Sequence, residues 1–253
     1  MGKDRFLKIL CDHPLLWGAV LFASGFFPLG TANLAIGQVP RDLQLSEFPN
    51  PPQQLQQLIA AGDVSFKIGT RVDSGDPRIV GETRYDMSYT YKSQSNLNLL
   101  RDEQGGRVLL INVRFSRMQW KSKHVIWLRD QPAAEGFWSN PILLHEFDHV
   151  RISTDPRVAK RFSELIKKRT VIRHQLQPGE IAGRELADKL VEREVRSVFE
   201  ELTELIAIRY LELDRETVHG QRPLPRNSNL HNLLRPASAE VQPEAANAAS
   251  DSG

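Results

Sequence analysis

The sequence predicts an α+β fold in which an antiparallel-type sheet comes first and a helical region follows. Two observations lead to this prediction. Short stretches that alternate apolar with polar residues, separated by turn signals, occupy the chain between residues 64 and 127. From Ser139 onward, apolar residues recur at helical spacing instead. The composition, with 40% hydrophobic and 25% charged residues, is that of a globular protein with a sizeable core.

Residues 1–32 have the pattern of an export signal. Basic residues between positions 3 and 8 precede the apolar run Leu15 to Phe27, and the chain is uncharged from Pro14 to Pro40. This order is typical of a secretory signal, and the small residues that end at Ala32 predict cleavage there. An uncleaved signal anchor, with Leu15 to Ile36 in the bilayer, is the alternative. Both interpretations predict an exported protein of the periplasm, cell envelope or extracellular space, and the second adds a membrane tether.

A linker is predicted over residues 33–55, and the sheet follows it. The stretch Tyr85 to Tyr91 alternates aromatic or apolar residues with polar ones, as a half-buried strand does. Gly105 and Gly106 mark a turn into the next strand. The predicted strands are Val64–Thr70, Thr83–Tyr91, Val108–Arg114 and His124–Trp127, and a short helix is predicted at Gln53–Ala61.

Three helices are predicted in the second half of the chain. Asn140 gives the first helix a cap and Pro141 occupies its first position, so that it continues through His149 and ends before Pro156. Apolar spacing predicts two more helices. From residue 221 onward polar residues, Pro and Ala dominate, and a disordered tail is predicted over 221–253. The folded domain is expected to cover residues 56–220, with its later helices at Arg157–Gln175 and Ile181–Leu213.

Charge and cysteine content exclude some classes of function. The formal net charge is +2, from 33 basic and 31 acidic residues, which gives no reason to expect a nucleic-acid partner. The single cysteine, Cys11, lies in the predicted leader, so the rest of the chain has neither a thiolate metal ligand nor a cysteine nucleophile. A metal site in this protein must therefore use His, Asp or Glu.

The predicted first helix carries the motif H-E-x-x-H, from His145 to His149. Two residues four apart project from the same face of a helix, so both imidazoles can bind one Zn²⁺ ion. Glu146 lies next to that face, where it can act as the general base toward a zinc-bound water. The motif therefore predicts a zincin-like metallohydrolase helix with Glu146 as its catalytic residue.

A catalytic zinc ion usually takes three protein ligands, and the motif supplies two. No third histidine follows His149 at short spacing, so the third ligand must come from farther along the chain. His219 is preferred, because it follows the long helix in a loop that Gly220 allows to bend. The candidates that stay open are Asp214, Glu201, Glu204 and Asp155.

Two separated segments of the chain resemble the DUF922 family of bacterial secreted proteins, which are predicted zinc-dependent proteases. The first segment runs from Trp138 to His149 and contains the H-E-x-x-H motif. The second, Leu213 to Gly220, has the pattern D-x-x-T-x-H-G, and the resemblance covers roughly residues 60 to 225. It implies that His219 is the third metal ligand. Leu213 and the pair Phe147-Asp148 depart from the family pattern, and neither departure touches a ligand.

The leading hypothesis is an exported zinc-dependent hydrolase, and within that class a metallopeptidase that acts on a peptide or protein substrate. Tyr210, His174 or an arginine are the candidates for stabilising the oxyanion. The alternative is a non-catalytic cell-envelope protein with a structural or vestigial metal site. A third hypothesis is an interaction module that docks partners on the long helix and binds no metal.

Overall fold

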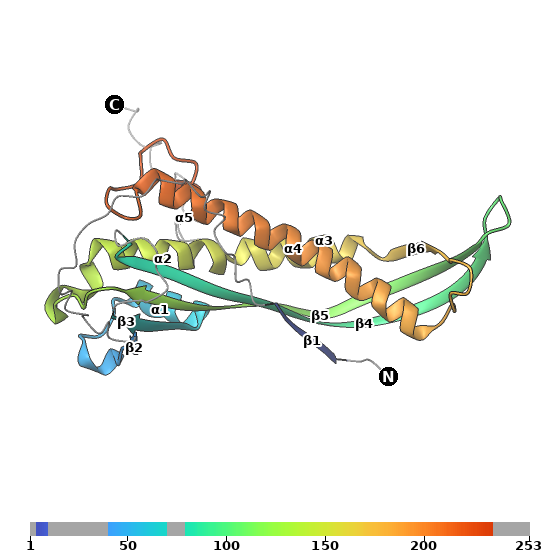
Figure 1. Ribbon diagram of the computed structural model, residues 1–253, viewed down its shortest axis with the longest axis horizontal. Coiled ribbons are helices and arrows are strands. Elements are labelled where there is room, and N and C mark those ends of the chain that lie inside the picture. The colour runs from blue at the N-terminus through green and yellow to red at the C-terminus, as the bar shows by residue number, and fades with distance from the viewer. Residues whose placement is uncertain (1–3, 10–39, 70–78, 235–253) are drawn as a thin grey trace, which may run out of the picture.

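The computed structural model describes residues 4–9, 40–69 and 79–234, and it shows an elongated molecule built on one long β-hairpin (Figure 1). Within the predicted leader, Asp4–Ile9 forms strand β1. The apolar run Leu15 to Phe27 and the predicted cleavage position at Ala32 lie outside the described residues. In the described part of the chain, no helix is long and apolar enough to cross a membrane.

The described strands form one mixed sheet, in which β5 is central. The order is β1-β4-β5-β3-β2, and β6 also pairs with β5. All neighbours are antiparallel except β3 and β5, which are parallel. This pair corrects the prediction of an antiparallel-type sheet, because β3 lies beside β5 rather than beside its chain neighbour β4. The strands are β2 (Arg41–Asp42), β3 (Val64–Ile68), β4 (Gly81–Arg101), β5 (Arg107–Leu128) and β6 (Val171–Gln175).

One long hairpin replaces three of the predicted strands. β4 extends the predicted strand Thr83–Tyr91 at both ends, and β5 joins two segments predicted as separate strands, Val108–Arg114 and His124–Trp127. The turn forms where predicted, with Gly105 at a φ of 81°. In β5 a bulge with Arg117 at a φ of 50° shifts the register against β4. The shift interrupts the alternation of apolar and polar residues, which explains why the sequence pattern suggested two strands.

The helix predicted to reach Gln175 is shorter, because its last residues form a strand. α3 (Pro156–Lys168) ends before Arg169, whose N–H donates to the carbonyl of Ile166. The residues that follow, β6, pair with β5 over Val108–Asn112. Backbone pairing with an available sheet edge outweighs the weak helical pattern of this stretch.

Helices cover one face of the hairpin (Figure 1). α2 (Pro141–Thr154) has its predicted cap, since the Asn140 side chain accepts a hydrogen bond from the N–H of Leu143. α4 (Arg184–Thr217) starts three residues later and ends four residues later than predicted. The core beneath α3 and α4 is aromatic: the Tyr89 ring lies 5.7 Å from Phe162 and 4.8 Å from Phe199, centroid to centroid.

A second apolar cluster lies on the other side of α2 and fixes its orientation. Phe66 of β3, Phe137 and Trp138 contact one another there, and Leu143 and Phe147 of α2 are completely buried in it. Because apolar residues anchor α2 on this side, its histidine-bearing face is directed toward α4. The short helices around this cluster are α1 (Gln53–Gly62), η1 (Leu45–Glu47) and η2 (Ala134–Ser139).

Folded structure continues past residue 220, contrary to the prediction of disorder from there. Leu230 is completely buried in the core, and α5 (His231–Leu234) follows it. Arg157 of α3 donates a hydrogen bond to the carbonyl of Asn232. Leu224, Leu233 and Leu234 also pack against the core, so scattered leucines anchor this otherwise polar stretch. Residues 235–253 lie outside the described part of the chain.

Candidate metal centre

Both histidines of the H-E-x-x-H motif lie on the face of α2 that is directed toward α4. His145 and His149 are buried, with exposed fractions of 5% and 4%. Their ring centroids are 4.8 Å apart, as expected for residues one helical turn apart. The helix predicted for this motif is thus confirmed, and its two imidazoles point to one place.

Three donor atoms from two helices converge there. The Nε2 atoms of His145 and His149 are 3.2 Å apart, and Oδ1 of Asp214 in α4 lies 3.0 Å and 3.1 Å from them, respectively. Ligands bound to zinc at ~2.1 Å in a tetrahedral site lie roughly 3.4 Å from one another. The three atoms therefore have the spacing of one face of a zinc tetrahedron, and the group could hold a metal ion.

Thr217 determines which nitrogen of His145 carries a proton. The Thr217 hydroxyl donates its only hydrogen to the carbonyl of Leu213, at 2.7 Å. Its oxygen lies 3.3 Å from Nδ1 of His145 and can only accept from it. Nδ1 is therefore protonated, and the lone pair of a neutral His145 ring is on Nε2, toward Asp214. Two acceptor atoms 3.0 Å apart need a proton or a cation between them, which fits a metal site.

A sharp turn at the end of α4 brings the chain back against His145. Gly220 has a φ of 76°, and a Cβ atom placed on it would lie 2.7 Å from the Cβ of His145. Only glycine fits this conformation and this close approach. Asp214, Thr217 and Gly220 thus all contact or surround one histidine, His145.

The charges of the cluster stabilise one another. Burial alone would raise the pKa of Asp214, but its interactions with the rings of His145 and His149 outweigh burial and lower that pKa well below its ordinary value. Burial would favour the neutral ring of His149, yet the hydrogen bond to Asp214 and the charge of Glu146 raise the pKa of that ring. An ionised Asp214 at neutral pH is the form that binds a cation.

Glu146 is buried, and β4 holds its carboxylate. The Thr83 hydroxyl lies 2.7 Å from Oε2 of Glu146, to which it donates a hydrogen bond. Gly81 lies against Glu146 as well, since a Cβ on it would be 2.8 Å from Oε1. Burial raises the pKa of Glu146, and the nearby histidines and Thr83 oppose that rise. A carboxyl group with a raised pKa beside the donor cluster can both accept and release a proton.

A buried hydrogen-bond chain supports the opposite side of His149. The Tyr210 ring packs on the His149 ring at a centroid distance of 4.4 Å, and its hydroxyl donates to Ser153 at 3.0 Å. Ser153 lies 2.6 Å from Nε2 of His124, whose Nδ1 donates to the carbonyl of Gly62 at 2.7 Å. Nδ1 of His149 itself has no hydrogen-bond partner among the described residues.

The other predicted ligands lie at different distances from the centre. His219 is 62% exposed, and its Nδ1 is 3.5 Å from Oδ1 of Asp214. Its φ of 53°, after 52° at Val218, places two consecutive non-glycine residues in the left-handed region. Glu201 and Glu204 are exposed on α4, outside the donor group, and Asp155 caps α3 and binds Arg157. The structure thus brings Asp214 into the group and places His219 beside it.

The predicted oxyanion candidates have other partners. The hydroxyl of Tyr210 is directed at Ser153. His174 lies on β6 and is paired with Glu180 at 2.9 Å. Thr83 and Gly81 contact the predicted base, yet no sequence motif indicated them, because their role depends on how β4 packs against α2.

Comparisons with protein-family models, with curated proteins and with solved structures found no match. The class of the site is therefore inferred from the residues that form it: two imidazoles and a carboxylate around one point, with a buried glutamate alongside.

Proposed function

We propose that this protein is an exported zinc-dependent hydrolase, most specifically a metallopeptidase of the DUF922 type. The observation that carries the proposal is the convergence of three donor atoms within 3.0–3.2 Å of one another, next to Glu146. Two histidines and one carboxylate are a ligand set typical of catalytic zinc, and no thiolate is needed for it.

In this proposal His145, His149 and Asp214 hold the metal. A bound zinc ion lowers the pKa of a coordinated water toward ~7 and polarises a carbonyl group. Glu146 takes the proton of the attacking water and delivers it to the leaving amine. Thr83 keeps the Glu146 carboxylate in place, and Thr217 keeps Nε2 of His145 free of a proton.

The test separates metal binding from hydrolysis. Glu146→Gln keeps the size and the buried hydrogen bond of the side chain but removes its basicity. The variant is expected to bind one equivalent of zinc with the affinity of the native chain, and to lose hydrolysis of a casein substrate by at least ~10²-fold. A Glu146→Gln variant with undiminished hydrolysis rules out the assigned base.

One observation favours the alternative of a structural site. His219 lies close enough to Asp214 that its ring could supply a fourth protein ligand, and a zinc ion with four protein ligands has no position for water. This alternative predicts that His219→Ala lowers zinc affinity and that the native chain hydrolyses nothing. The catalytic proposal predicts that hydrolysis depends on added zinc and disappears with a chelator.

A further inference from the structure

Among the described strands, the sheet has an open edge along the middle of β5. β6 pairs with β5 up to Asn112, and β3 pairs with it from His124 onward. The N–H of His124 is directed at the carbonyl of Asp63, at 3.4 Å, which closes one end of the gap. Among the described strands, none pairs with this edge of β5 between those two limits. β6 and β3 lie on either side of the gap, along the same edge of β5. A strand added there would occupy the same position in the sheet as these two strands, next to β5 and one strand away from β4.

Backbone groups in the gap are directed outward. N–H groups along a strand point alternately to its two sides, so those of Trp120 and Ser122 point the same way as that of His124. The bulge at Arg117 precedes this stretch, and the register with β4 is regular from Gln119 to Leu128. β5 therefore offers a short row of donors and acceptors in the geometry of a sheet edge.

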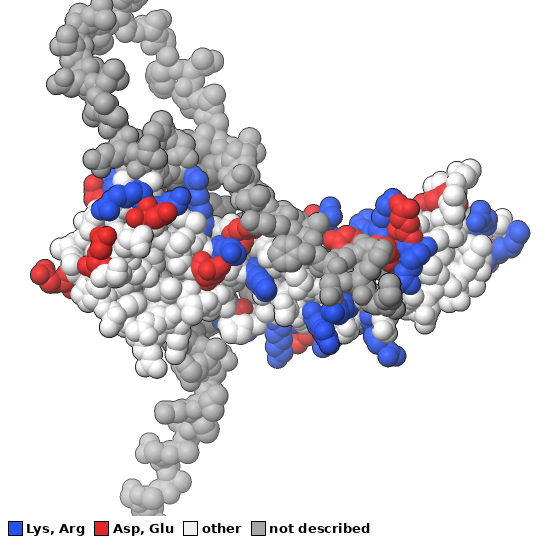
Figure 2. Space-filling view, turned by 90° about the horizontal axis from the view of Figure 1, so that it is seen from below, with Lys and Arg blue, Asp and Glu red and all other residues white. Residues whose placement is uncertain are grey.

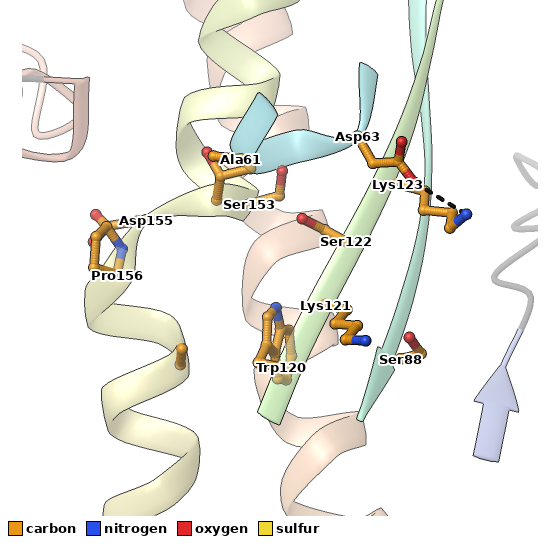
Figure 3. Close-up of a pocket in the computed structure, with 12 residues that line it drawn as sticks. Ala61, Asp63, Ser88, Trp120, Lys121, Ser122, Lys123, Ser153, Asp155 and Pro156 are labelled. Carbon is orange, nitrogen blue, oxygen red and sulfur yellow. Dashed lines mark ion pairs between the residues drawn. The ribbon is translucent and has the colours of Figure 1, made fainter. Parts of the chain in front are cut away.

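A cavity of 390 Å³ lies beside this edge. Trp120 and Ser122 lie on the β5 side of it, and Ser153, Asp155 and Pro156 from the α2–α3 junction lie on the other (Figure 3). The indole Nε1 of Trp120 is buried and has no hydrogen-bond partner among the described residues. An unpaired buried N–H group costs free energy, and an acceptor in the cavity would remove that cost.

The charges around the cavity favour an acidic ligand. Both carboxylates in its lining already have partners, since Asp63 is 3.0 Å from Lys123 and Asp155 is 2.6 Å from Arg157. Within the described residues, Lys121 has no ion-pair partner, and it is exposed. On the sheet face opposite the helices, Lys and Arg side chains gather along the hairpin (Figure 2).

The gap along β5 and the cavity beside it together form a slot. We propose that this slot binds an extended, acidic peptide segment of a partner protein, which adds to β5 as a short strand. Its backbone pairs with the outward groups of Trp120 and Ser122, a carbonyl accepts from the Trp120 indole, and an acidic side chain lies near Lys121. Ala61 and Ala159 are among the residues that line the slot, and their small side chains leave room in it for a side chain of the peptide.

The probe is a fluorescein-labelled peptide of about six residues, alternating valine and threonine with a central glutamate. Its binding to the purified full-length chain is measured by fluorescence anisotropy in EDTA, so that the metal centre does not contribute. We expect saturable binding. Ser122→Pro removes the outward N–H but no hydrogen bond to β4, and should weaken binding about tenfold or more, whereas Ser122→Ala should bind like the native chain.

A second arm does not depend on the folding of any variant. Two versions of the peptide carry N-methyl groups on alternate amides, on one side of the strand or on the other. Strand addition predicts that one version loses binding and the other keeps it. The proposal is overturned if no saturable binding occurs, or if both methylated versions bind like the parent peptide. In that case the bulge and Lys121 serve to protect the edge from pairing.

Discussion

At the scale of single residues, Thr217 supports His145 in a way that no described residue supports His149. Its hydroxyl is locked by the Leu213 carbonyl and can only accept from Nδ1 of His145. Hydrogen bonds of this kind orient a metal-binding imidazole and fix its tautomer. The His149 ring packs against Tyr210, and its Nδ1 has no hydrogen-bond partner among the described residues.

Replacing Thr217 tests this role. Thr217→Val keeps the shape of the side chain and removes the acceptor, and it is expected to weaken zinc binding by about 10–100-fold. Thr217→Ser keeps the acceptor and should bind zinc like the native chain. Chelator-competition titrations give both affinities. Equal affinities for the valine and serine variants contradict the role assigned to the hydroxyl.

His124 makes the stability of the fold depend on pH. Burial lowers its pKa, while in the unfolded chain the ring has its ordinary pKa of about 6.5. Below that pH the unfolded chain binds a proton that the folded chain resists, so this contribution to the free energy of unfolding is complete above pH ~6.5 and is lost as the pH falls. Urea denaturation in EDTA should show a smaller loss between pH 7 and pH 5 for His124→Gln. Parallel curves for the two proteins would contradict the prediction.

At the scale of elements, the turn that follows α4 determines how closely the chain at Gly220 approaches His145 of α2. Gly220 combines a positive φ with contact to His145, whereas Gly179 has a φ of 82° and open space around it. A side chain added at Gly179 therefore introduces backbone strain alone, whereas one added at Gly220 introduces backbone strain together with a steric clash.

Alanine at these two positions makes a matched pair. Gly179→Ala should lower the free energy of unfolding by about 1 kcal/mol and leave zinc affinity unchanged. Gly220→Ala adds a clash with His145 and should lower the free energy of unfolding further, by roughly 1–3 kcal/mol, together with zinc affinity. Thermal denaturation and zinc titration check both. The proposed contact is refuted if the two variants behave alike.

Elements with local signals were predictable, whereas the extent of β5 and the existence of β6, which depend on pairing, were not. α2 has a cap, a proline and an apolar face within its own sequence, and its predicted bounds hold. β5 and β6 depend on a bulge and on partners distant in the chain, and both were misjudged. The same reason applies to the site: the spacing of His145 and His149 is local, whereas Thr83 reaches Glu146 only through the packing of β4 on α2.

The preference for His219 over Asp214 has a physical cause of the same kind. The apolar spacing ended the long helix at Leu213, which placed both residues in a loop. In the structure α4 continues to Thr217, so Asp214 is a helical residue that faces α2, and His219 lies just past the helix end. The last turn of α4, which the sequence pattern did not predict, therefore places Asp214 in the donor group and leaves His219 outside it.

At the scale of the whole molecule, the donor group joins elements that are far apart in sequence. α2 supplies both histidines and α4 supplies Asp214, and each helix is anchored in the core on its other side. The hairpin brings Thr83 against the same group from the sheet. A metal bound there links two helices and is expected to stabilise the fold in proportion to its affinity and concentration.

The most direct test of this account is the zinc content and zinc affinity of Asp214→Ala compared with His219→Ala, measured on the purified full-length chain by elemental analysis and chelator competition. The account predicts that His219→Ala retains one equivalent of zinc with an affinity near that of the native chain, and that Asp214→Ala loses it. Stoichiometric zinc of unchanged affinity in Asp214→Ala, with loss in His219→Ala, would contradict it.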